Sequence, residues 1–294
     1  MNIGLIDVDS HNFPNLALMK ISAYHKERGD SVEFWNGLKK YDLVYQSKIF
    51  DETYTPDNEF IIQADEVIKG GTGYDLKNKL PDEIEHHFPD YELYTGFEGR
   101  AYGFLTRGCP RGCPFCIVSE KEGTTHTVAD LGEFWNGQKE IILMDSNITA
   151  SEDCEKHFDA LIKSGALINF EGGLDIRFLT DKGAAQLNKM RTSMIHFAWD
   201  NYEFKTYEKL KRIRPLLKKR DRELGVYVLT NYNTTIEQDL ERIYKLKEIG
   251  FTPYVMIYDK PNAPREIRKL QRWCNNRIVF RTVERFEDLD LSKC

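Results

Sequence analysis

The chain has 294 residues, of which 41% are hydrophobic and 12% aromatic, enough for one large domain or two of ordinary size. It contains no run of roughly 18 apolar residues, so it lacks the signature of a membrane-spanning helix. The acidic residues Asp7 and Asp9 close to the start of the sequence are also untypical of a secretory signal peptide. We therefore expect a cytoplasmic protein with no membrane partner.

The net charge of −6 is unevenly distributed along the chain. Residues 1–99 hold 19 acidic and 9 basic side chains, whereas the remaining residues hold 28 acidic and 32 basic ones. Such an asymmetry predicts two bodies with different surfaces.

The first hundred residues alternate between strand-like and helix-like patterns. A polar stretch with two prolines at 80–94 predicts a domain boundary, giving a first domain at 1–94 and a second at 95–294. The glycines at 70–73 are interpreted as a turn, because no helix is predicted directly after them to form a phosphate cradle. We expect a small open, Rossmann-like α/β sheet in the first domain. Its predicted elements are strands at 2–8, 31–35, 41–47 and 66–69, and a helix that opens at Pro14 and stops at Gly29.

A short loop with three cysteines follows the first strand of the second domain. Cys109, Cys113 and Cys116 have a C-x3-C-x2-C spacing within the run YGFLTRGCPRGCPFCI at 102–117. Thiolates favour iron–sulfur centres or zinc, and three ligands leave a tetrahedral centre with one open position. Cys154, Cys274 and Cys294 are scattered singly, so we expect ordinary thiols there and no second cluster.

The cysteine loop resembles the cluster-binding signature of radical S-adenosylmethionine (SAM) enzymes, in which an aromatic residue precedes the third cysteine as Phe115 does here. The resemblance implies a [4Fe-4S] cluster whose fourth iron is chelated by SAM. It also implies reductive cleavage of SAM to a 5′-deoxyadenosyl radical, which abstracts hydrogen from a substrate. An external electron donor of the flavodoxin or ferredoxin type would be required. Phe115 and Ile117 correspond to residues that flank the adenine.

The first domain resembles the cobalamin-binding domain that precedes the radical domain in one branch of this family. Asp9 and His11 follow the first strand, where that branch can carry an Asp-x-His-x-x-Gly motif. Here Pro14 occupies the glycine position and the sheet is short, so the motif is broken. A truncated domain that has kept only the fold is favoured over one that binds cobalamin.

After the cysteine loop, strands and helices alternate in order. Six strand–helix units predict a parallel sheet curved into a partial (β/α)6 TIM-like barrel, followed by a C-terminal helical extension. The resemblance implies the same barrel. The predicted strands are 101–106, 141–144, 167–170, 194–198, 225–229 and 253–257, and the predicted helices are 153–163, 181–189, 202–222, 236–249 and 265–274.

Polar residues follow several of these strands, where parallel α/β folds bind ligands. Asp145 and Asn147 stand where the resemblance implies contacts with the methionine amino group of SAM. Asp175 is suited to ribose hydroxyls, and Arg177 to a carboxylate or, alternatively, to an ion pair with Asp175 itself. Asn231, after the fifth strand, is a further candidate for contact with the cofactor.

The remaining features leave the substrate and the catalytic side chain open. His196, in the fourth strand, is either a proton donor inside the barrel or a packed core residue. Residues 205–222 carry nine basic and two acidic side chains, so a nucleic-acid substrate competes with a solvated helix face. Two other functions remain: a non-enzymatic zinc-stapled or iron–sulfur binding or accessory protein, and a radical methyltransferase acting on RNA or a small molecule. In a zinc site, His126 is the only nearby fourth ligand.

Overall fold

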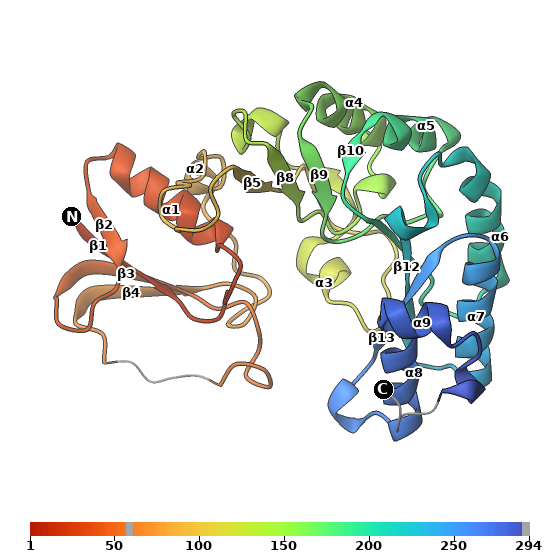
Figure 1. The fold of residues 1–294 in the computed structure, drawn as a ribbon. Helices are drawn as coiled ribbons and strands as arrows, with labels where there is room; N and C mark the ends of the chain where they lie inside the picture. The colour runs from red at the N-terminus through yellow and green to blue at the C-terminus, as the bar shows by residue number, and fades with distance from the viewer. Residues whose placement is uncertain (57–60, 290–294) are drawn as a thin grey trace. The chain divides into compact units, whose positions relative to one another are not determined.

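The computed structural model describes residues 1–56 and 61–289. The chain packs as two compact units, Met1–Ile142 and Leu143–Cys294, which are described separately. Both are mixtures of helices and mainly parallel strands, which confirms the predicted α/β class (Figure 1). The partial barrel, the Rossmann-like arrangement and the domain boundary near residue 94 stay predictions.

The first unit opens with a four-stranded parallel sheet in the order β2-β1-β3-β4. Helix α1 lies along this sheet, as Figure 1 shows, and begins where the side chain of Asn15 accepts a hydrogen bond from the amide of Leu18. The elements are β1 (Asn2–Asp7), α1 (Leu16–Glu27), β2 (Ser31–Phe34), β3 (Tyr41–Ser47), β4 (Ala64–Gly70) and α2 (Asp82–Glu85). Their shared core contains Ile3, Leu5, Leu18, Ile21, Leu43 and Ile84.

The segment after α2 is tied to the later part of the first unit. The hydroxyl of Tyr91 donates to the carbonyl of Phe134 at 2.7 Å and accepts from the amide of Tyr102 at 2.9 Å. The imidazole of His86 contacts the carboxylate of Glu133 at 2.7 Å. These bonds explain why the packing of this unit continues past the polar stretch at 80–94 and includes the cysteine loop.

The rest of the first unit contains short elements. β5 neighbours β8 in a sheet, while β6 and β7 form an antiparallel pair in which Thr106 faces Thr127 and Arg107 faces His126. The strand predicted at 101–106 is therefore divided into two. The elements are β5 (Arg100–Gly103), β6 (Thr106–Arg107), α3 (Val118–Glu122), β7 (His126–Thr127), the 3-10 turn η1 (Leu131–Glu133) and β8 (Glu140–Leu143), in which the division between the units falls.

The second unit keeps the predicted alternation of strands and helices. β9 pairs with β10, and β11, β12 and β13 form a parallel sheet. Its strands are β9 (Leu167–Phe170), β10 (Arg191–Thr192), β11 (Ile195–Ala198), β12 (Leu224–Thr230) and β13 (Thr252–Ile257). Its helices are α4 (Cys154–Ser164), α5 (Asp181–Lys189), α6 (Phe204–Ile213), α7 (Ile236–Glu248), α8 (Arg265–Asn275) and α9 (Arg277–Thr282).

The helix predicted at 202–222 is shorter than expected. α6 ends at Ile213, because Pro215 has no amide hydrogen for a helical bond and clashes with the preceding turn. The 3-10 turns of this unit are η2 (Ile148–Ala150), η3 (Arg214–Leu216), η4 (Asp221–Glu223), η5 (Lys260–Asn262) and η6 (Phe286–Asp288).

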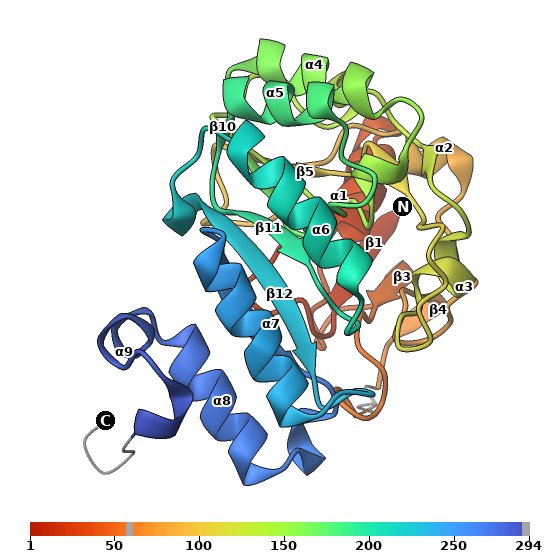
Figure 2. The same cartoon turned by 90° about the vertical axis from the view of Figure 1, so that its right-hand side faces the viewer.

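The β11-β12-β13 sheet has one apolar face and one mixed face. Figure 2 shows α6 and α7 running beside β12, and α7 and α8 pack on the sheet. Alternating residues on the covered face are fully buried: Ile195, Phe197, Val226, Val228 and Val255. Within the described residues, no helix is both long and apolar enough to cross a bilayer.

Candidate functional site

The three cysteines lie on a loop that the β6–β7 pair closes at its base. Cys109 and Cys113 are half-buried, and Cys116 is exposed. The amide of Cys109 donates to the carbonyl of Gly123 at 3.0 Å, and the amide of Cys116 donates to the carbonyl of Cys113 at 2.9 Å. The loop is thus a local unit that presents three thiols within eight residues of sequence.

Two glycines give the loop its shape. Gly108 has φ of +85°, and a Cβ atom there would lie 2.3 Å from the carbonyl oxygen of Thr124. Gly112 has φ of +55°. Only glycine adopts such conformations freely, so the glycines are required for the turns on both sides of Cys109.

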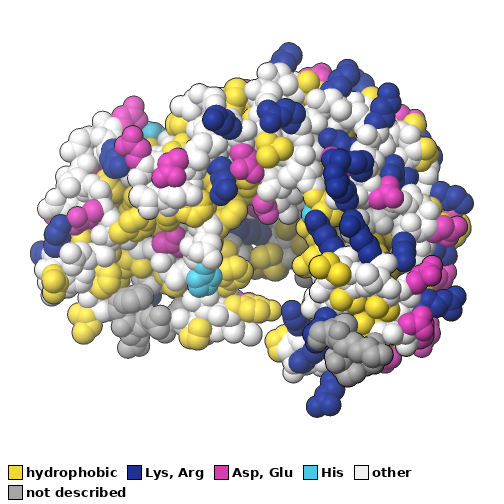
Figure 3. Space-filling model, in the orientation of Figure 1, with side chains coloured by type: hydrophobic (Ala, Val, Ile, Leu, Met, Phe, Trp, Pro, Cys, Tyr) yellow, Lys and Arg dark blue, Asp and Glu magenta, His cyan; other side chains and the backbone are white. Residues whose placement is uncertain are grey.

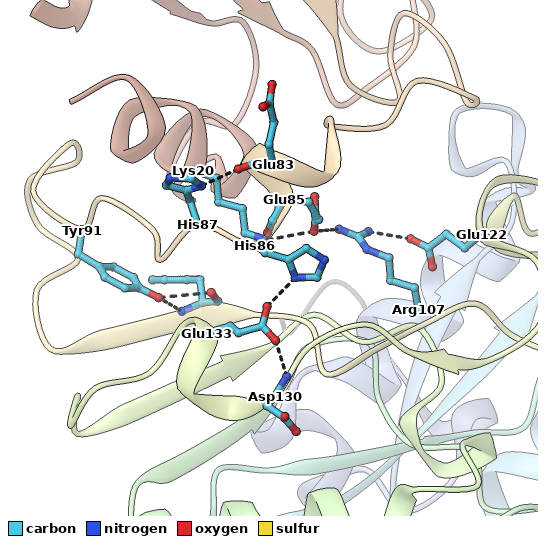
Figure 4. Close-up of polar contacts among 11 residues, drawn as sticks. Lys20, Glu83, Glu85, His86, His87, Tyr91, Arg107, Glu122, Asp130 and Glu133 are labelled. Carbon is cyan, nitrogen blue, oxygen red and sulfur yellow. Dashed lines mark hydrogen bonds and ion pairs between the residues drawn. The ribbon is translucent and has the colours of Figure 1, made fainter. Parts of the chain in front are cut away.

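The carboxylate of Glu122 holds the start of the cysteine loop, a role that sequence analysis missed. It accepts a hydrogen bond from Arg107 at 3.1 Å, as Figure 4 shows, and another from the amide of Gly108 at 2.9 Å. The guanidinium of Arg107 also lies 3.9 Å from the centre of the Phe104 ring. No local pattern marks Glu122, because its partners are 14 and 15 residues away.

The three thiols of the loop are the type of donor that iron–sulfur clusters use. Among the described residues, no three His, Cys, Asp or Glu side chains are grouped to hold one metal ion. In a [4Fe-4S] site the three thiolates bind different irons, so they need not converge on one point. His126 is exposed, and its Nδ1 contacts the carbonyl of Thr124 at 2.9 Å. The loop therefore offers three thiols of the type that a cluster requires.

The strand ends of the second unit bring three of the predicted cofactor residues together. Arg177 binds Asp175 in a bidentate ion pair, with nitrogen–oxygen distances of 2.8 and 2.6 Å. The side-chain amide of Asn147 lies 3.4 Å from the same carboxylate. The hydroxyl of Thr149, which sequence analysis missed, donates to Asn147 and accepts from the amide of Asp175. The ion pair with Asp175, one of the two roles considered for Arg177, is present.

Asp145 lies beside the end of β9. It is buried, with 3% of its surface exposed, and so is Asn147. A Cβ atom on Gly172 would lie 2.2 Å from the carbonyl oxygen of Asp145, so only a glycine permits this close approach. The amide of Glu171 also donates to the carbonyl of Leu143 at 2.9 Å. The residues after β8 and β9 are thus neighbours, as expected for parallel strands.

Asn231 and His196 are held within the fold. Asn231 has φ of +61°, and its side-chain amide donates to the carbonyl of Tyr258 at 2.8 Å. The ring of His196 stacks on Tyr227, with centroids 4.5 Å apart and an interplanar angle of 5°. Burial, followed by the charge of Arg277, lowers the pKa of His196, so the ring is neutral at pH 7. A neutral stacked ring is a poor proton donor.

Phe115 and Ile117 belong to the first unit. Phe115 is half-buried, whereas Ile117 exposes 49% of its surface immediately before α3. Their predicted place beside the adenine remains a prediction.

A buried arginine that sequence analysis missed holds the ends of β11 and β12. Arg242 and Asp239, both on α7, are fully buried and form an ion pair at 2.6 Å. The same guanidinium donates to the carbonyls of Trp199 at 2.5 Å, Asp200 at 3.1 Å and Leu229 at 2.7 Å. This arginine therefore fixes the backbone from which the strand-end loops depart.

The isolated cysteines behave as ordinary thiols where they are described. Burial raises the pKa of Cys154 to about 12 and that of Cys274 to about 12, so both stay protonated at neutral pH. Cys294 lies outside the described residues.

Basic side chains are scattered over the visible surface of the second unit, with acidic ones between them (Figure 3). Several of those at 205–222 have partners within the unit. Arg212 pairs with Asp181 at 2.8 Å, and Arg214 pairs with Asp221 at 2.5 Å. Lys219 donates to the hydroxyl of Thr192 at 2.8 Å. These contacts involve only part of the basic stretch, and a nucleic-acid substrate stays a prediction.

One residue of the broken cobalamin motif, Asp9, is used by the fold itself. Asp9 is buried, and its carboxylate accepts from the amides of Ile49 at 2.7 Å and Phe50 at 2.9 Å. His11 is exposed with φ of +49°. Cβ atoms on Gly71 and Gly73 would each lie 2.2 Å from a backbone oxygen of residues 48–50. The glycines therefore pack against the chain, and cobalamin enters no step of the function proposed below.

The fold of the chain is similar to that of two solved structures of a radical SAM methyltransferase. Both are structures of TsrM from Kitasatospora setae, one with cobalamin and a [4Fe-4S] cluster bound and one with its tryptophan substrate and the SAM analogue aza-SAM. They are 10% and 11% identical to this chain, with TM-scores of 0.62 and 0.64. Each match covers 87% of this chain, and 74% and 72% of the respective TsrM chains. No family model and no curated protein matches the chain.

Proposed function

We propose that the protein is a radical SAM enzyme, in which Cys109, Cys113 and Cys116 hold a [4Fe-4S] cluster. The observation that carries the proposal is the C-x3-C-x2-C loop, closed by its own β-hairpin, in a chain whose fold is similar to that of a radical SAM methyltransferase. When bound, the cluster would supply the electron that cleaves SAM to methionine and a 5′-deoxyadenosyl radical, which takes hydrogen from the substrate. An external flavodoxin or ferredoxin would act as donor in the cytoplasm.

The chain's own residues would bind and orient SAM. Asp175 would accept hydrogen bonds from the ribose hydroxyls, and Arg177, which Asp175 holds in a bidentate ion pair, would bind the SAM carboxylate. Asn147 and the backbone at Asp145 would receive the amino group.

Three further side chains complete the proposed cofactor contacts. Phe115 and Ile117 would cover the adenine. Asn231 would act through the turn that its bond to Tyr258 stabilises.

Methyl transfer is the second candidate, since the similar structures are of a radical SAM methyltransferase. Transfer of the SAM methyl group leaves S-adenosylhomocysteine, whereas hydrogen abstraction leaves 5′-deoxyadenosine. The two reactions are therefore separated by their nucleoside products. A non-enzymatic accessory protein would form neither product.

The test is product analysis after anaerobic cluster reconstitution with SAM and a strong reductant. We expect 5′-deoxyadenosine from the wild type and none from the triple Cys109→Ala, Cys113→Ala, Cys116→Ala variant. Cys154→Ala is the matched control and should retain the wild-type yield. S-adenosylhomocysteine as the cysteine-dependent product would favour the methyltransferase. Zinc in place of iron in the purified protein would contradict both.

A further inference from the structure

Helix α3 begins two residues after the last cysteine of the loop, and its final turn reaches back to the loop's start. The carboxylate of Glu122, only 9% exposed, joins the amide of Gly108 to the guanidinium of Arg107. The carbonyl of the next residue, Gly123, accepts a hydrogen bond from the amide of Cys109. One carboxylate therefore holds the two ends of the cysteine loop together.

The same contacts continue to the N-terminal sheet. Figure 4 shows Arg107 lying between Glu122 and Glu85, with its Nη2 3.5 Å from a carboxylate oxygen of Glu85. Glu85, at the end of α2, forms a second ion pair with Lys20 of α1 at 3.0 Å. A row of four alternating charges thus links α1, α2, β6 and α3 within the first unit.

A second connection runs from the adjacent residue of α3. The ammonium of Lys121 donates to the hydroxyl of Thr72, in the glycine-rich turn after β4. Burial lowers the pKa of Lys121, opposed by the neighbouring charge of Glu122. Because Gly71 and Gly73 are packed against the backbone of residues 48–50, Thr72 offers Lys121 a fixed partner. This contact gives the glycine-rich turn a use that its sequence did not reveal.

We propose that Glu122 and Lys121 are positioning residues that fasten the cysteine loop to the N-terminal sheet. The role of that sheet is then to hold three thiols in a cluster-binding arrangement before the cluster is bound. Loops with several positive-φ glycines have many accessible conformations, so the contacts that select one conformation raise the affinity for the bound group. The inference rests on the proposed function for the identity of that group, a [4Fe-4S] cluster.

The principal test is Glu122→Gln, which preserves size and removes the charge. The amide can accept only one of the two hydrogen bonds, so its NH2 group must face a donor at Gly108 or Arg107. In metal-free protein, we expect amide hydrogen exchange at Gly108 and Cys109 to be about tenfold faster, as for the loss of one charge-assisted bond. The amides of β1 and β3 should exchange at the wild-type rate.

In reconstituted protein, the same variant should release iron to a chelator about tenfold faster, because the loop samples open conformations more often. Glu140→Gln is the matched control. Glu140 also pairs with an arginine of the first unit, Arg100 at 3.0 Å, but that pair lies outside the cysteine loop. Its exchange and iron release should equal those of the wild type.

Wild-type exchange at Gly108 and Cys109 in Glu122→Gln would overturn the inference. If that variant does not fold, Thr72→Val tests the connection between α3 and the glycine-rich turn, because it removes only the hydroxyl that Lys121 contacts. Faster exchange in α3 alone would support the second connection, and unchanged exchange would overturn it. Exchange in metal-free protein needs neither cluster nor SAM, so a failure of the proposed function is seen separately, as an absence of 5′-deoxyadenosine from the wild type.

Discussion

Replacing Arg242 by methionine should destabilise the second unit strongly. Methionine keeps most of the length of the side chain but donates no hydrogen bond. The variant would leave the buried carboxylate of Asp239 without its cation and remove a donor from the carbonyls of Trp199, Asp200 and Leu229. Burial already raises the pKa of Asp239 even with Arg242 present, so an unpaired carboxylate there is especially unfavourable.

Removing one member of a fully buried ion pair costs about 3–5 kcal/mol of unfolding free energy. For a unit of this size, this corresponds to a fall in Tm of about 6–20 °C. The double variant Asp239→Leu, Arg242→Met should recover part of the loss, because it leaves no buried charge. The remainder, about 1–3 kcal/mol, would reflect the carbonyls that have lost their donor.

The assay is anaerobic urea unfolding of the metal-free protein, followed by tryptophan fluorescence. Trp199 is a suitable probe, because it is buried and stacks on Tyr207 at 5.6 Å. Arg212→Met is the control, since Arg212 pairs with Asp181 at the surface and such pairs stabilise little. An Arg242→Met protein within about 1 kcal/mol of the wild type would show that the buried pair does not hold the strand ends.

Three further predictions concern the thiols and His196. Cys113→Ser should lose iron and 5′-deoxyadenosine formation, and iron content with product analysis checks this against a retained cluster. Iodoacetamide at pH 8 should label Cys113 in the metal-free protein but neither Cys154 nor Cys274, whose pKa values burial raises to about 12; peptide mapping that finds equal labelling would contradict it. Because burial lowers the pKa of His196 from 6.5, the stability contributed by its neutral ring is complete above 6.5 and is lost as the pH falls. His196→Gln should therefore weaken the decline in Tm between about pH 7.5 and pH 5, and parallel Tm curves would refute the assignment.

The features that sequence predicted are those encoded locally. The spacing of the cysteines, the glycines that allow the loop to turn, and the alternation of strands and helices all depend on residues close together in the chain. The four strands of the first sheet and α1 lie where the hydrophobic pattern placed them. The end of α6 at Ile213 was not predicted, although Pro215 marks it by lacking the amide hydrogen that a helix needs.

The features that sequence missed depend on contacts between distant residues. Glu122 is an ordinary acidic residue of a short helix until the fold places Gly108 beside it. Arg242 belongs to an amphipathic helix, where an arginine would be expected to face water. It is instead fully buried and donates hydrogen bonds to backbone carbonyls. In both cases the side chain satisfies backbone groups that leave strand ends, and no one-dimensional pattern records which backbone groups need such partners.

The proposed SAM-binding residues hold one another in place. Asp175 and Arg177 hold each other in a bidentate pair, and Thr149 fixes Asn147 relative to Asp175. Each side chain thus has its rotamer set by a neighbour before any ligand is bound, which reduces the entropy lost on binding.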